Sequence, residues 1–104
     1  MRVRGLGPAE QNAIRECLQF VVASGELAGE FQTRLGVTEH EVKATLDAWP
    51  NVDDVQDRSS AALAINNAVN EVLHGIRVRD WDRWFTVTPG QIRAAFEAWT
   101  SHDG

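Results

Sequence analysis

The sequence predicts an all-α protein, a small bundle of about five helices built from two pseudo-equivalent halves. Apolar residues recur at helical spacing through most of the 104 residues, and alternation of period two is confined to residues 76–79. In addition, residues 37–49 and 87–99 agree at five of thirteen positions, with conservative differences at five more. Such a repeat indicates internal duplication, so we expect one domain, 1–104, with half-repeats at approximately 8–50 and 59–100.

Composition and charge exclude several classes of protein. No apolar run reaches the roughly 18 residues of a membrane span, and no apolar stretch of a signal peptide follows the N-terminus, so we expect a cytoplasmic protein without a membrane partner. Cys17 is the single cysteine, which excludes a disulfide framework or a thiolate cluster within one chain. Its place on an apolar stripe indicates a small buried side chain. The net charge of −5 argues against nucleic acid as the main partner.

The first half is expected to hold three helices. Pro8 stands at a tolerated first-turn position, and apolar residues follow at helical spacing until Gly25 ends the first helix. Residues 27–35 form a short second helix. The third begins at the N-cap Thr38 and ends at Trp49, because the following proline disfavours helical backbone there.

The second half is expected to repeat this order. A serine at 59 or 60 caps a helix that runs to His74, and the segment 77–85 replaces the short helix with a connector carrying Trp81. The last helix begins after Thr88. Because Trp49 and Trp99 close the repeated helices at the same position, we expect equivalent buried environments and a cost of about 3–5 kcal/mol for either Trp→Ala change.

An unusual group of polar residues interrupts the fourth helix: Asn66, Asn67, Asn70, Glu71 and His74. Asparagine is a mediocre helix former, so three within five residues require a reason. One interpretation is structural, with at least one amide hydrogen-bonded to the backbone of segment 51–58 or 77–85, so that its loss would cost about 1–3 kcal/mol. The other is a polar binding face. Glu71 and His74 also match half of a di-iron motif, but the first half offers no counterpart, so we expect no metal and no cofactor.

A basic and aromatic cluster lies in the connector: Arg77, Arg79, Trp81, Arg83 and Trp84. Arginine and tryptophan together are typical of protein hot spots. Trp81 aligns with the apolar Phe31 and is expected to be buried. Trp84 aligns with Arg34, so we take Arg83 and Trp84 as further binding candidates.

Residues 30–46 resemble a helix-turn-helix DNA reader, with Gly36 at the turn and Val42 beyond it. The resemblance implies a DNA-binding function. The pattern departs at Gln32, where a small residue is usual, and at Thr45, where an apolar one is. The helix that would read DNA carries three acidic residues against one lysine, a balance that repels phosphate.

We therefore expect a small acidic protein-interaction module of regulatory or immunity-protein type, which acts by binding a protein partner or a second copy of itself. No Ser-His-Asp or Cys-His spacing and no glycine-rich phosphate loop stands out, so catalysis is not the favoured interpretation. Two alternatives stay open: a helix-turn-helix nucleic-acid-binding protein, and a small-molecule-binding or enzymatic domain that uses the asparagine-rich helix.

Overall fold

The computed structural model describes residues 2–54 and 58–101 and confirms the all-α class, since none of these residues forms a strand. Six α-helices follow one another: α1 (Pro8–Ala23), α2 (Phe31–Leu35), α3 (Glu39–Ala48), α4 (Arg58–Asn70), α5 (Trp81–Trp84) and α6 (Pro89–Ser101). A 3₁₀ turn, η1 (Asn51–Asp54), follows α3, and a π-helical turn, η2 (Glu71–Gly75), extends α4. The expected connector at 77–85 therefore contains the short α5. Segment 51–58 begins with η1, and residues 55–57 lie outside the described part.

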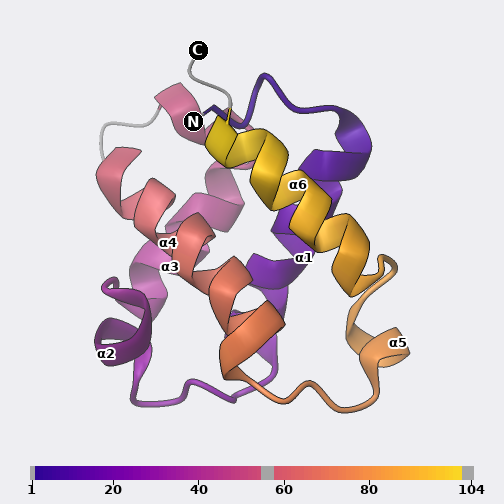
Figure 1. Cartoon of the computed structure of the whole chain (residues 1–104). Helices are drawn as coiled ribbons and strands as arrows, with labels where there is room; N and C mark the ends of the chain where they lie inside the picture. The colour runs from indigo at the N-terminus through magenta and orange to yellow at the C-terminus, as the bar shows by residue number, and fades with distance from the viewer. Residues whose placement is uncertain (1, 55–57, 102–104) are drawn as a thin grey trace.

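Helix α1 is the centre of the bundle. It packs against α3, α4 and α6, and α3 also packs against α4. In Figure 1, α4 and α6 lie in front, while the short helices α2 and α5 stand at opposite sides of the molecule. None of the helices in the described ranges is both long and apolar enough to pass through a lipid bilayer.

The core is built from matching stripes of the two long helices. One side of α1 is buried, as its apolar spacing predicts, and the side of α4 that faces it is buried in the same way. The buried apolar residues are Ala13, Ile14, Cys17, Leu18, Phe20 and Val21 on α1, and Ala61, Ala64, Ile65, Ala68 and Val69 on α4, continued by Val72 in η2.

The two repeated helices begin with the capping interactions that the sequence predicts. The Glu41 amide donates to Thr38 Oγ1 at 3.1 Å, and the Thr38 amide donates to Glu41 Oε1 at 2.9 Å. At α6, the Gln91 amide donates to Thr88 Oγ1 at 3.1 Å, and the Thr88 amide donates to Gln91 Oε1 at 2.8 Å. Both helices thus start with a reciprocal pair that satisfies otherwise unpaired amides.

The expectation of equivalent tryptophans is wrong. Trp99 is 2% exposed, whereas Trp49 is only half-buried. The reason lies in where each helix ends. Helix α3 stops at Ala48, and Trp49 is an extended C-cap before Pro50, so its ring leaves the buried stripe. Helix α6 continues to Ser101 and keeps Trp99 on the buried side.

Trp81 is also half-buried, although we expected a buried ring. It stacks on Phe85 with ring centroids 4.3 Å apart, and its Nε1 donates to the Val87 carbonyl at 2.7 Å. The indole thus packs on the core with one face and uses its polar edge to hold the turn before α6.

Candidate functional site

The asparagines of α4 divide into an inner and an outer set. Asn67 points towards α2, where its Nδ2 donates to the Leu35 carbonyl at 2.7 Å. Asn66 Nδ2 donates to Asn67 Oδ1 at 3.0 Å. The expected hydrogen bond to backbone is therefore confirmed for Asn67, but its partner is the end of α2 and neither of the two segments we had expected. An amide at 67 satisfies a carbonyl that the short helix leaves unpaired.

Glu71 and His74 do not form a joint site. The Glu71 carboxylate accepts two hydrogen bonds from Arg34, from Nη2 to Oε1 and from Nε to Oε2 at 3.1 Å. Such a bidentate pair fixes both side chains, and the Glu71 side chain is only 14% exposed. His74 is exposed. Within 2–54 and 58–101, no group of three or more His, Cys, Asp or Glu side chains is placed to hold a metal ion.

The outer set belongs to an uncharged surface that we call the α4 face, composed of Leu63, Asn66 and Asn70, with His74 following in η2. Leu63 is 46% exposed, and no other large hydrophobic side chain in the described part is classed as exposed. Residues 63, 66 and 70 share one side of the helix by their spacing. From residue 59 to residue 70 the helix carries no charged residue.

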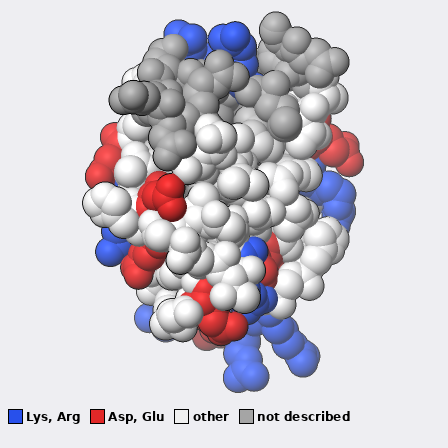
Figure 2. Space-filling model, turned by 90° about the vertical axis from the view of Figure 1, so that its left-hand side faces the viewer, with Lys and Arg blue, Asp and Glu red and all other residues white. Residues whose placement is uncertain are grey.

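Two of the other helices, α3 and α6, carry charge on their solvent side. Helix α3 exposes Glu39, Lys43 and Asp47, and α6 exposes Arg93 and Glu97. Figure 2 views the side of the molecule on which α2, α3 and α4 lie in Figure 1. Much of the centre of this view is free of charged side chains, which lie mostly towards its edges (Figure 2).

Arg83 and Trp84, the second pair of candidate binding residues, lie on the short helix α5. Trp84 is half-buried and packs edge-to-face on Phe20, with ring centroids 5.4 Å apart. The Arg83 guanidinium lies 5.3 Å from the Trp84 ring centroid, in cation–π geometry. Figure 1 shows their helix, α5, on the opposite side from α2, so the structure does not bring Arg83 and Trp84 together with the inner asparagine, Asn67.

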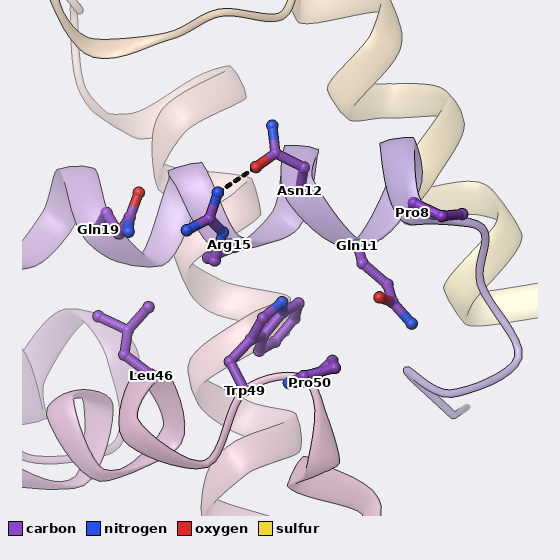
Figure 3. Close-up of a pocket in the computed structure, with 8 residues that line it drawn as sticks. All are labelled: Pro8, Gln11, Asn12, Arg15, Gln19, Leu46, Trp49 and Pro50. Carbon is purple, nitrogen blue, oxygen red and sulfur yellow. Dashed lines mark hydrogen bonds between the residues drawn. The ribbon is translucent and has the colours of Figure 1, made fainter.

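A pocket of about 440 Å³ between α1 and the end of α3 was not anticipated from the sequence. Figure 3 shows residues of α1 along one wall and the indole of Trp49 projecting from the other. The amides and the arginine of α1 look like an ordinary solvated helix face in the sequence, so no pattern marks them. The lining residues are Pro8, Gln11, Asn12, Arg15, Gln19, Leu46, Trp49 and Pro50.

Arg15 is held in this pocket by a chain of hydrogen bonds that begins in the core. Glu16 is 7% exposed, and its carboxylate accepts the Thr86 amide at 2.8 Å and the Thr86 hydroxyl. It also accepts Asn12 Nδ2 at 2.9 Å. With its amide group fixed in this way, Asn12 presents Oδ1 to Arg15 Nη2 (Figure 3).

Cys17 is fully buried, as expected. Burial raises the pKa of its thiol, and the neighbouring Glu16 raises the same pKa further. A thiolate is the nucleophilic form of cysteine, so this environment suppresses nucleophilic chemistry at Cys17.

Helices α2 and α3 form the expected helix–turn–helix order, with Gly36 in a left-handed conformation at the turn. The departure from the DNA-reading pattern at Thr45 has a structural explanation. Thr45 is 5% exposed, and its hydroxyl donates to the Glu41 carbonyl at 2.9 Å, so it replaces the usual apolar residue without leaving a buried group unpaired. Lys43 lies 3.3 Å from the Glu39 carboxylate, which offsets the positive charge of α3.

Comparison of the chain with protein-family models, with curated proteins and with solved structures finds no match in any of the three.

Proposed function

We propose that this chain is a non-catalytic protein-interaction module that binds a protein partner through the α4 face. One observation carries the proposal: an exposed helix presents Leu63 on the same side as the amides of Asn66 and Asn70, with no charged residue from 59 to 70. Surface helices ordinarily place charged residues opposite their buried stripe. The central parts of protein interfaces are depleted of charged residues, and the α4 face contains none.

The same residues explain how such a face would bind. Leu63 supplies apolar surface that is in contact with water in the free protein, so covering it is favourable. The side chain of Asn70 is exposed, and that of Asn66 is half-exposed. Both can donate and accept hydrogen bonds, and a neutral amide loses less hydration free energy on burial than a charged group does. Asn67 and Glu71 support the face from beneath through their bonds to α2.

Leu63→Arg is expected to weaken binding of the partner at least tenfold, because it places an unpaired charge at the centre of the buried surface. The melting temperature should stay within a few degrees of the wild-type value, since Leu63 is not part of the core. The partner is recovered by affinity capture from the native host, and its affinity for each purified variant is then measured by titration. Sedimentation of the isolated chain tests the case in which the partner is a second copy.

Ala94→Arg provides the matched control, because Ala94 is an exposed helical position on α6. It should leave the affinity unchanged. Equal affinity of the Leu63→Arg variant and the wild type would show that the α4 face is not the contact surface. Loss of binding in both variants would indicate a general effect of added charge and would also contradict the proposal.

We infer further that the two halves, 8–50 and 59–100, are copies of one ancestral unit. Several correspondences support this inference. Five buried apolar residues of α1 have buried apolar counterparts in α4 and η2 at an offset of 51, and α3 and α6 begin with the same reciprocal caps. By that offset position 16 corresponds to position 67, and each makes a hydrogen bond to the turn of the other half, at Thr86 and Leu35 respectively.

A second correspondence concerns the short helices. Phe20 matches Glu71 at the offset of 51, and Arg34 matches Trp84 at the offset of 50 that relates residues 37–49 to 87–99. Each half thus joins its long helix to the short helix of the other half, once by an aromatic contact and once by an ion pair. Such an exchange is expected when one packing site is kept while its chemistry changes. At the offset of 51, the α4 face also corresponds to part of the pocket on the first half. Its residues Leu63, Asn66 and Asn70 match the pocket residues Asn12, Arg15 and Gln19.

A further inference from the structure

We propose that the pocket between α1 and α3 is a binding site for a small aromatic carboxylate, in which Arg15 pairs with the carboxylate and Trp49 packs against the ring. This site is separate from the α4 face and makes no use of its residues. Its volume of about 440 Å³ falls in the range of small-molecule sites.

The charge of the pocket selects an anion. Arg15 is the one charged residue among the eight described residues that line it, and no carboxylate lines it. Its guanidinium donates to the neutral oxygen of Asn12 and forms no ion pair with any described residue. An arginine carries five N–H donors, so this single bond leaves the planar edge that recognises a carboxylate through two parallel hydrogen bonds.

The arginine is also preorganised. Asn12 is fixed by Glu16, and both oxygens of Glu16 are occupied by the backbone and side chain of Thr86 and by Asn12. The carboxylate of Glu16 is thus fully engaged by Thr86 and Asn12. Because Arg15 is held before a ligand arrives, less rotational freedom is lost on binding, which improves affinity.

The opposite wall of the pocket favours a flat, apolar group in the ligand. Trp49, Leu46 and Pro50 are half-buried and supply a flat indole, a branched aliphatic group and a proline ring. The Trp49 ring projects towards α1 in Figure 3, so a flat group that enters between the walls meets it. Aromatic pairs contribute beyond the area that they bury. Gln19 adds a polar amide at one end of the pocket.

Titration of the ¹⁵N-labelled protein with benzoate tests the site directly. Benzoate should shift the Arg15 Nε–H and Trp49 Nε1–H resonances in a saturable manner. Benzamide has the same shape without the charge, and we expect it to bind at least about tenfold more weakly, because a charge-assisted pair is replaced by neutral bonds. Arg15→Gln should reduce the affinity for benzoate at least about tenfold and leave the spectrum otherwise dispersed, since residue 15 lies on the surface. Arg15→Lys should retain part of the affinity.

N-acetylphenylalanine, titrated in parallel, distinguishes a free organic acid from the carboxyl terminus of a peptide as the source of the group. Tighter binding of either compound supports the carboxylate site and identifies the source. The proposal is overturned if benzoate produces no saturable shift, if benzamide binds equally well, or if Arg15→Gln binds benzoate as the wild type does. None of these results depends on whether a protein partner binds the α4 face.

Discussion

Trp99→Ala is expected to destabilise the protein by about 3–5 kcal/mol, the typical cost of deleting a buried aromatic side chain. Trp99 is 2% exposed, and it packs on Phe96 with ring centroids 5.9 Å apart. Its removal leaves a large cavity near the end of α6, which neighbouring side chains fill only in part. For a domain of this size the loss is a large share of the whole free energy of unfolding. Urea denaturation followed by circular dichroism measures it.

Trp49→Ala provides the comparison within the same repeat. Because its ring is half-buried and lines an open pocket, the expected cost is about 1–2 kcal/mol, a value ordinary for a partly exposed side chain. Equal losses in the two variants would show that the two rings have the same environment in solution and would contradict the packing described for α3.

Gly75→Ala is expected to cost about 1–3 kcal/mol, as the loss of a hydrogen-bonded charged pair does. A Cβ at residue 75 would overlap the Glu71 carboxylate, whose Cδ would lie 2.8 Å away. The carboxylate cannot simply turn aside, because Arg34 holds it by two hydrogen bonds. Glycine at 75 therefore provides the space in which the ion pair between α2 and η2 forms.

A double-mutant cycle separates this effect from backbone freedom. In a Glu71→Ala background the overlap disappears, and Gly75→Ala should then be neutral or stabilising by about 0.4–1 kcal/mol, because alanine restricts the unfolded chain more than glycine does. Chemical denaturation of the four proteins gives the coupling free energy. A coupling near zero would mean that Glu71 and Gly75 act independently.

The sequence predicts most of the helices because their signals are local. The N-caps Thr38 and Thr88, the apolar stripe around Ile14 and the stop before Pro50 depend on neighbours within a few residues, and the structure contains each of them. The burial of Cys17 follows from the same stripe. Such features can be predicted from sequence because helical geometry places residues three and four apart on the same face.

The features that sequence patterns do not reveal depend on contacts between distant segments. Arg34 and Glu71 are 37 residues apart, and Glu16 and Thr86 are 70 apart. Neither pair has a fixed spacing, so no motif indicates it. The sequence shows that the asparagine cluster is unusual, but it does not show where each side chain points. Only the structure separates the inner Asn67 from the outer Asn66 and Asn70. The pocket at Arg15 forms because α3 ends before Trp49, which places the indole in the pocket wall. The alignment of the two repeats instead predicts that Trp49 is buried in the same way as Trp99.

Site-specific photo-crosslinking in the native host tests whether a protein partner binds at the α4 face. A benzophenone amino acid is placed at position 70 on the α4 face and at position 94 on α6, both of which are exposed helical positions. We expect a covalent adduct with one protein, or with a second copy of the chain, from position 70 and none from 94. An adduct from position 94 together with none from 70 would contradict binding through the α4 face.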